Sequence, residues 1–512
     1  MGLRPIGLAS EAALHGLNNL QILGVLCVSV VNPFRARIWL ACHSFSDGWL
    51  VLTVALAALA QVVASSCLMV LTWDGAGYVF NTIQRGHPVV PNSRYSDYPL
   101  LAVVSLFSFL INDSRLLACI YGLVLAVLPL GSLLLSFHFL SAPQHARLRI
   151  WPVLGILLSV LPGQAFLVAE AVPVAQVSWA VWAIAAADIS ISSLVWLAIL
   201  NLFLFFLHPS SALVYAVTGA LFVGKAWVET SHRRTNAWLG AIFLALAAVR
   251  LGYAVATANS YERGEESLSQ NYLAFRDALP SLGMLPVVYL LGLTVLGGVI
   301  RRIPKPYMIW LAGLTLALLL AYGVAWAADP KMWVSAFTFR RFVFVGTLPL
   351  VVMGGLHWRY EQRSRTNDSS DRSDHRLDWI MAGSAAVFFI VFATQSFSWR
   401  QELSHFEADL KRCDKPVATI ADFPWIADSP LHHWASTQLS CVVQGKKVKT
   451  VFSLDPDGVR RNKILLFPGI WFRRQNRWFE FEGVPQEPND ELRKEPHGES
   501  GRSGPSRRSG YP

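Results

Sequence analysis

The sequence alternates between long apolar runs and short polar segments. The first run long enough to cross a hydrocarbon core of about 30 Å as a helix extends from Leu50 to Thr72. Further apolar runs lie near residues 116–140, 150–170, 173–188, 190–207, 212–228, 237–257, 281–300, 307–327, 340–357 and 379–397. The pattern predicts an all-α polytopic membrane protein with about eleven transmembrane helices.

The same pattern divides the chain into four parts. Residues 1–48 are expected to form a cytoplasmic or interfacial segment, because the apolar run Leu20 to Val31 is too short to span a bilayer. Residues 49–397 are the multi-span membrane domain. Residues 398–484 are expected to form a small α+β extracytoplasmic C-terminal domain, and residues 485–512 have the Gly-, Pro- and Ser-rich charged composition of a disordered tail.

Residues 73–114 form a long polar loop between the first two predicted spans. It is interrupted by Leu100 to Ile111, which is too short to span and is expected to lie as a helix in the membrane interface. In the C-terminal region, Trp399 to Leu410 has helical periodicity. The predicted strands are Val442–Val443, Val448 to Phe452 and Ile464 to Phe467.

Orientation follows from the Lys and Arg residues, which concentrate in cytoplasmic loops. All the basic clusters fall on one side if the 173–207 region is two short helices that turn near Asp188. A single tilted helix there would move the later clusters to the opposite side, so two helices are favoured. The clusters are Arg35 and Arg37; Arg147 and Arg149; Arg233 and Arg234; Arg301, Arg302 and Lys305; and Arg359, Arg363, Arg365, Arg372 and Arg376. This places the N-terminus in the cytoplasm and the 73–114 loop and the C-terminal domain outside.

Composition agrees with the membrane class. Hydrophobic residues make up 54% of the chain and charged residues 15%, whereas soluble domains carry about 25% charged residues. The formal net charge is +10, but the basic residues are scattered over short loops and the tail instead of forming a basic domain with interleaved aromatics. No nucleic-acid partner is therefore predicted.

Two of the six cysteines stand apart from the apolar segments. Cys413 and Cys441 both fall in the polar C-terminal region, where an oxidising compartment would favour a disulfide between them. The other cysteines lie in or near apolar segments and share no metal-ligand spacing, so they are interpreted as packing residues.

The sharpest chemical feature is the stretch Trp73-Asp74-Gly75-Ala76-Gly77-Tyr78. It places a carboxylate directly after the first span, and its two glycines are expected to let the chain turn away from the membrane. An acid at a membrane boundary is either a catalytic group or an ordinary helix-end carboxylate. In the same loop Asp97 is interpreted as a second catalytic group or as a local ion-pair partner of Arg94. Asp113 is expected to cap the helix that follows it.

The large first extracytoplasmic loop, the acid just past the first span and the soluble tail together resemble the GT-C class of membrane glycosyltransferases. The stretch Asp74-Gly75-Ala76-Gly77-Tyr78, continuing through Pro91 to Leu100, is similar to loops in bacterial members of that class. The resemblance covers residues 49–400 as architecture. The chain lacks a paired acidic motif such as Asp-Asp or Glu-Glu in this loop, and for that reason no cofactor and no metal site are predicted, the alternative being a divalent metal bound without that motif.

The resemblance implies transfer of a sugar from a polyprenyl-phosphate carrier, embedded among the membrane lipids, to an unidentified extracytoplasmic acceptor. Asp74 matches the position of the catalytic acid of that class, and the location it implies is a bacterial inner membrane. The leaving phosphate requires cationic partners. Arg250 inside a span and Arg340 and Arg341 at the start of another are assigned to substrate binding together with Arg94, the alternative for Arg340 and Arg341 being interfacial anchoring.

Two other functions are compatible with the sequence. A transporter or lipid-linked-sugar flippase would need charged groups near the membrane midplane. Few intramembrane charges are visible: Lys225 near a cytoplasmic end, Asp188 at the proposed turn, and Arg250. A non-catalytic assembly protein would use the aromatic-rich C-terminal region to bind a partner.

Overall fold

The computed structural model describes residues 48–72, 74–89, 95–159, 171–229, 232–257, 284–300, 339–364, 375–429, 431–432, 435–454 and 478–481, with single residues at 309, 313 and 317. This part of the chain is predominantly helical. Its α-helices are α2 (Gly48–Ser66), α3 (Asp74–Arg85), α4 (Tyr98–Ser108), α5 (Ser114–Leu125), α6 (Val127–Phe139), α7 (Ile150–Val153), α8 (Ala171–Ala186), α9 (Ile191–Phe205), α10 (Ser211–Val228), α11 (Arg233–Thr257), α14 (Met284–Ile300), α16 (Phe339–Ser364), α17 (His375–Arg412) and α18 (Ser436–Gln444).

Five stretches in the described residues are long and apolar enough to cross a membrane: Gly48–Ser66, Ser114–Phe139, Ser211–Val228, Arg233–Thr257 and Leu377–Arg412. Shorter apolar helices occupy Val172–Ala186, Ile191–Phe205 and Val288–Gly297. The predicted helical fold, with helices long and apolar enough to cross a membrane, is confirmed at this level. The full count of about eleven crossings stays a prediction.

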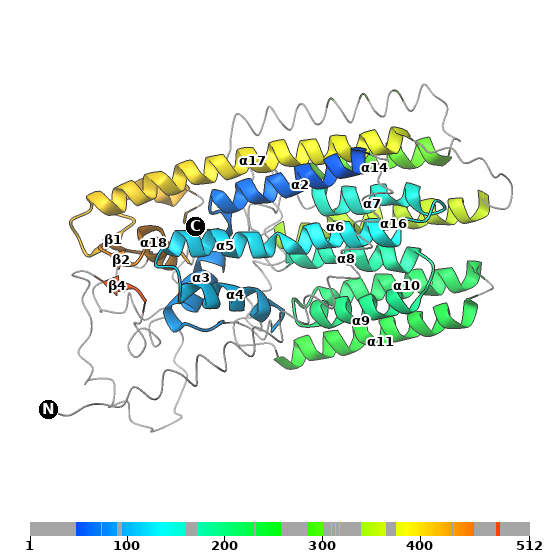
Figure 1. The fold of residues 1–512 in the computed structure, drawn as a ribbon, viewed down its shortest axis with the longest axis horizontal. Coiled ribbons are helices and arrows are strands. Elements are labelled where there is room, and N and C mark those ends of the chain that lie inside the picture. The colour runs from blue at the N-terminus through cyan, green and yellow to red at the C-terminus, as the bar shows by residue number, and fades with distance from the viewer. Residues whose placement is uncertain are drawn as a thin grey trace, which may run out of the picture.

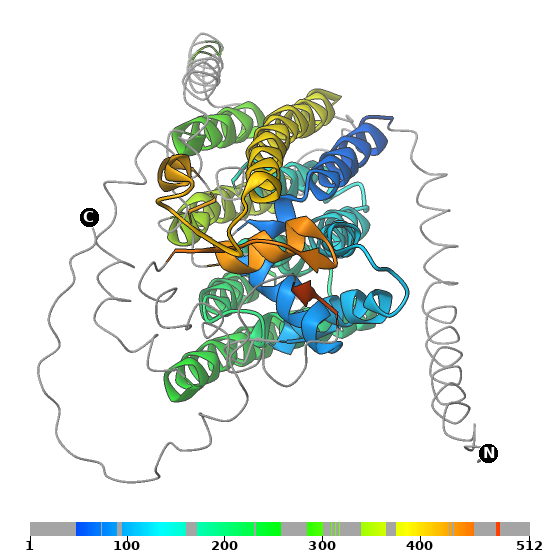
Figure 2. The same ribbon diagram turned by 90° about the vertical axis from the view of Figure 1, so that its left-hand side faces the viewer.

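The helices run side by side as a bundle, and α3, α4 and α18 gather at one end of it (Figure 1). Figure 2 looks onto that end, where the short helices and strands cover the bundle. Contacts identify the helix ends that meet there. Ser96 of the 3-10 turn η2 (Tyr95–Asp97) bonds to carbonyls at the end of α9, and Ser114 Oγ at the start of α5 donates to the Val442 carbonyl of α18 at 2.6 Å. We call this the α3 end.

The opposite end is held by a second group of contacts. Arg147 in the 3-10 turn η3 (Ala146–Arg149) lies 3.3 Å from Glu361 near the end of α16. His145 lies 3.5 Å from Asp188, between α8 and α9, and Lys225 near the end of α10 donates to carbonyls at the end of α8. Because the basic loops of the described residues meet here, we call it the basic end.

The division of the 173–207 region into two helices is confirmed. α8 ends at Ala186 and α9 begins at Ile191. Ser190 caps α9, since its hydroxyl accepts from the Ser193 amide at 3.1 Å and its own amide donates to the Ser193 hydroxyl at 3.2 Å. This reciprocal capping box stops a single helix from running through Asp188.

The predicted cap at the start of α5 is likewise confirmed. Asp113 Oδ1 accepts a hydrogen bond from the Arg115 amide at 2.9 Å. The short helix expected between Leu100 and Ile111 is α4, and apolar side chains near its end are exposed, with Phe109 74% and Leu110 75% accessible. Its position in the membrane interface stays a prediction.

The C-terminal region continues the bundle. α17 passes without a break through the expected domain boundary at residue 398, so the helical prediction for Trp399 to Leu410 is confirmed and that segment belongs to the last described apolar helix. Trp399 Nε1 donates to the carbonyl of Leu68 at 3.0 Å. Arg115 Nη1 lies 3.0 Å from Glu407. These contacts join the late part of α17 to the turn that follows α2 and to the start of α5.

Short elements complete this region. β1 (Val417–Thr419) pairs in parallel with β3 (Val451–Ser453), and β2 (Lys447–Val448) pairs in parallel with β4 (Glu480–Phe481). The strand predicted over Val448 to Phe452 is therefore two strands separated by two residues. The strand predicted at Val442–Val443 is wrong: both valines belong to α18, which packs on α3. The predicted strand at 464–467 lies outside the described residues.

Candidate functional site

Asp74 is the first residue of α3, and its side chain is buried, with 7% of the residue exposed. The chain reaches it through a tight turn after α2, in which Leu68 has a φ of 61°, and through the 3-10 helix η1 (Met69–Leu71). The expectation that two glycines turn the chain away from the membrane is wrong. Gly75 and Gly77 lie inside α3, where both are buried.

α3 is buried because other elements cover it on several sides. It packs against α4 and α18, and the Phe80 ring stacks on Phe479 with centroids 5.0 Å apart. Asp74 thus sits in the first turn of a helix whose N-terminal end carries a partial positive charge from the aligned peptide dipoles. The dipole at this end of the helix is favourable for a negative charge.

Asp97 begins the neighbouring helix. It is the last residue of η2, is 5% exposed, and stands at the N-cap of α4 without a side-chain capping bond. Ser96 anchors this segment: its hydroxyl donates to the Phe203 carbonyl, and its amide donates to the Phe206 carbonyl at 3.5 Å. The structure therefore fixes Asp97 against the end of α9. Its expected partner Arg94 lies outside the described residues.

Arg250 of α11 lies in the same neighbourhood. The residue is 5% exposed, and its guanidinium carbon lies 5.5 Å from the Phe205 ring centroid and 5.4 Å from that of Tyr253. The centroid of the Phe206 ring lies 6.2 Å from that of Tyr253 and 5.9 Å from that of Tyr95. These four rings, Tyr95, Phe205, Phe206 and Tyr253, form an aromatic cluster that links the Asp97 segment to Arg250, with cation–π contacts holding the cation.

The structure thus brings Asp74, Asp97 and Arg250 to the α3 end. The assignment of Arg340 and Arg341 to substrate binding stays a prediction: both lie in the first turn of α16, and their side chains are outside the described residues. Among the described residues, no group of three or more His, Cys, Asp or Glu side chains is arranged to hold a metal ion.

The basic end contains a polar network that the sequence interpretation missed. Trp151 Nε1 donates to His357 Nδ1 at 2.9 Å, and His357 Nε2 lies 3.3 Å from Glu361, which also faces Arg147 at 3.3 Å. Because Nδ1 accepts, the proton of the neutral imidazole resides on Nε2 and is directed to Glu361. The i, i+4 spacing of His357 and Glu361 on a helix was the available signal.

The expected disulfide is not formed. Cys413 and Cys441 are both free cysteines, the first half-buried after the end of α17 and the second buried in α18. Cys413 Sγ lies 3.8 Å from the Lys415 carbonyl. Burial raises the pKa of the Cys441 thiol to about 12.

We therefore expect a maleimide reagent to label Cys413 and leave Cys441 unmodified in the folded protein at neutral pH, because the thiolate is the reactive form and Cys441 is both buried and protonated. Peptide mass spectrometry without added reductant measures both sites separately. Denaturation in the same reagent should label both thiols. Blocked labelling that only a reductant restores would show that the bridge exists.

Comparison with protein-family models, with curated proteins and with solved structures gave no match. The functional argument therefore stands on the residues and their geometry. Those residues are the two buried carboxylates Asp74 and Asp97 and the buried cation Arg250, which all lie at the α3 end.

Proposed function

We propose that the chain is a membrane glycosyltransferase of GT-C-like organisation, which moves a sugar from a polyprenyl-phosphate carrier to an acceptor outside the cytoplasm. The observation that carries the proposal is the buried carboxylate of Asp74 at the start of α3, directly after a helix long enough to span the membrane. In its ionised form, which the helix dipole favours, such a carboxylate can accept a proton.

In this mechanism Asp74 is the general base. An acceptor hydroxyl attacks the anomeric carbon of the sugar, its proton passes to Asp74, and the bond between the anomeric carbon and the phosphate oxygen breaks. The polyprenyl phosphate leaves with the electron pair of that bond. Asp97, fixed against α9 by Ser96, is proposed to assist by orienting the acceptor or the sugar.

The leaving phosphate needs cations. Arg250 is buried among aromatic rings at the α3 end, which suits a guanidinium that binds phosphate by charge and by its planar donor pattern. Arg340 and Arg341, at the start of α16, and Arg94, before η2, are proposed as further phosphate or sugar contacts.

Charge distribution supports the orientation in this proposal. The basic end, with Arg147, Arg149, Arg233 and Arg234 in loops or first turns, is assigned to the cytoplasm by the positive-inside rule. The α3 end and the C-terminal region are then extracytoplasmic. An alkaline phosphatase fused after residue 484 should be active in bacterial cells, and activity of a green fluorescent protein at that point instead would reverse the orientation.

The function is tested with purified protein and a panel of polyprenyl-phosphate-linked hexoses and pentoses. Wild-type protein should release polyprenyl phosphate from at least one donor in the presence of membrane acceptors. Arg250→Gln should raise the KM for that donor more than it lowers kcat, because a phosphate contact binds substrate before reaction. Folded protein that turns over none of the donors would contradict the proposal.

A transporter or flippase is the second candidate, favoured by the two buried cations Lys225 and Arg250 within spans. Lys225 lies three residues before the end of α10 and Arg250 seven before the end of α11, so they stand toward opposite ends of the bundle and not together at the midplane. Movement of lipid-linked sugar across the proteoliposome membrane without sugar transfer would favour this candidate. A non-catalytic assembly role predicts neither activity.

A further inference from the structure

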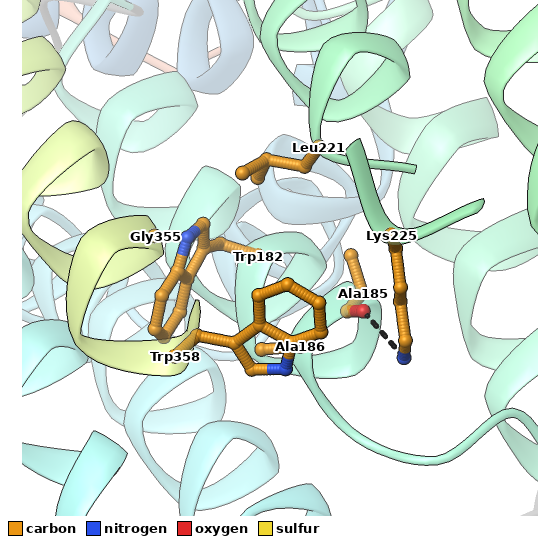
Figure 3. Close-up of a pocket in the computed structure, with 7 residues that line it drawn as sticks. All are labelled: Trp182, Ala185, Ala186, Leu221, Lys225, Gly355 and Trp358. Atoms are coloured by element: carbon orange, nitrogen blue, oxygen red, sulfur yellow. Dashed lines mark hydrogen bonds between the residues drawn. The ribbon is translucent and has the colours of Figure 1, made fainter. Parts of the chain in front are cut away.

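A crevice runs through the bundle between α8, α10 and α16. It consists of two small adjoining pockets that share Trp182 and Leu221 as wall residues. Figure 3 shows the first of them, with Trp358 and Gly355 from α16 facing Lys225 and Leu221 from α10. The walls are mainly apolar; the remaining lining residues are Ser178, Ala185, Ala186, Leu213, Val214, Val217, Thr218, Thr347, Leu348 and Val351.

The crevice extends along α10. On α10 its lining extends from Leu213 to Lys225, which corresponds to about 18 Å at the rise of an α-helix. One leaflet of a bilayer is about 15 Å thick in its hydrocarbon part. An apolar slot of this length among the helices of the bundle therefore matches a single lipid chain lying along it.

Gly355 keeps the crevice open on α16. A Cβ built at this position meets only Leu221, at 3.6 Å, so the space beside it is free for an occupant. The adjacent Gly354 is different, because a Cβ there would lie 2.8 Å from Trp182 and 3.1 Å from Trp151. Gly354 thus allows the tryptophan side chains to pack closely against α16, and Gly355 leaves the space between them open.

The polar end of the crevice offers one hydrogen-bond donor. Trp358 Nε1 is buried and has no hydrogen-bond partner in the described residues. Figure 3 shows this indole nitrogen on the side of the ring that faces Ala186 and Lys225. A buried N–H without an acceptor is unfavourable, and an oxygen brought by an occupant would remove that cost.

Lys225 does not add a net charge to this end. Its ammonium donates to the Ala185 carbonyl at 3.1 Å and to the Ala187 carbonyl at 2.5 Å, and it lies 3.8 Å from the Glu229 carboxylate. Because the cation is balanced by these groups, the crevice suits an uncharged acceptor better than a phosphate. This separates its occupant from the phosphate-bearing donor proposed for the α3 end.

We propose that the crevice binds one acyl chain of a membrane glycerophospholipid, whose ester carbonyl accepts the hydrogen bond of Trp358 Nε1. The headgroup stays outside at the basic end. The site is distinct from the proposed catalytic centre, and it makes a bilayer lipid a stoichiometric part of the protein.

Native mass spectrometry of protein purified from one membrane preparation tests the proposal. Wild type should retain about one glycerophospholipid per chain after mild delipidation. Gly355→Leu fills the slot and should lower this occupancy by about ten-fold, whereas the matched control Gly355→Ala should leave it unchanged. Trp358→Phe keeps the ring and removes the donor, and should lower occupancy by about five-fold.

Titration of delipidated wild-type protein with phosphatidylglycerol or phosphatidylethanolamine identifies the recognised group. Similar affinity for both is expected, because Trp358 contacts the ester and not the headgroup. Equal phospholipid occupancy per chain in wild type, Gly355→Leu and Trp358→Phe would overturn the proposal. So would displacement of the phospholipid by polyprenyl phosphate at equal concentration, or a strong preference for the anionic headgroup.

Discussion

Asp74→Asn is expected to lower the rate of sugar transfer by about 10²–10⁴-fold, the usual contribution of a positioned general base. Asparagine has nearly the same shape as aspartate but cannot accept the acceptor's proton. The residue is buried at the first turn of α3, so the substitution replaces a carboxylate by an amide of similar volume and should preserve the fold. Steady-state release of polyprenyl phosphate, normalised to folded protein, measures the effect.

Asp113→Asn is the matched control. Asp113 is also an acid at the start of a helix near the α3 end, but its side chain is partly exposed and its role is to cap α5. Asparagine is a good N-cap residue, so both activity and stability should be close to wild type. A rate for Asp74→Asn within two-fold of wild type would remove Asp74 from the chemistry, since a base contributes far more than that.

Gly155→Ala is expected to have the largest effect on stability. Gly155 lies in a π-helical turn, Leu154–Leu158, against the indole of Trp179. A Cβ at this position would fall 1.8 Å from Trp179 Cε2 and 1.9 Å from Nε1, and a buried indole ring has nowhere to move. We expect a loss of at least about 3 kcal/mol of unfolding free energy. The measurement is thermal unfolding in detergent, together with yield.

Gly131→Ala separates this clash from a general effect of replacing glycine in a span. Gly131 lies within α6, and a Cβ there would meet no atom within 4 Å. The substitution should be neutral or stabilising by up to about 1 kcal/mol, because alanine favours a helix interior over glycine. If both variants unfold at the same temperature, Trp179 does not occupy the space above Gly155.

Several local predictions succeeded because the deciding interactions are short-range. The break between α8 and α9, which was inferred from the distribution of basic clusters, is made by a serine pair three residues apart. The start of α5 was predicted from Asp113, which accepts a hydrogen bond from the amide two residues later. Such patterns are readable from sequence because both partners lie within one helical turn. The long apolar helices were predicted from the positions and lengths of the apolar runs.

The environment of Asp74 could not be predicted in this way. Two glycines near a membrane boundary usually indicate a turn, yet Gly75 and Gly77 are helical here. α3 is enclosed by α4 and by α18, and α18 is more than 350 residues away in the chain. Burial against such distant elements overrides local preference. For the same reason Val442 and Val443, adjacent β-branched residues, are helical where they pack on α3.

The site was predicted in part. Asp74, Asp97 and Arg250 were selected as an acid at a boundary, an acid in the first loop and a cation in a span, and all three lie at one end of the bundle. The aromatic cluster that joins two of them was not foreseen, because it combines Tyr95 with rings from α9 and α11. The crevice beside Trp358 depends on three separate helices and leaves no pattern along the chain.

The unbroken course of α17 has a mechanical consequence. With 38 residues it is about 57 Å long, roughly twice the thickness of a hydrocarbon core. It pairs with α2 along the bundle and reaches the elements that cover α3. A helix without a proline or a break transmits tilt and bends little. If the elements that cover Asp74 move, the opposite end of α17, which lies beside Trp49, should therefore move as well. A probe placed at that end could report events at the distant carboxylate.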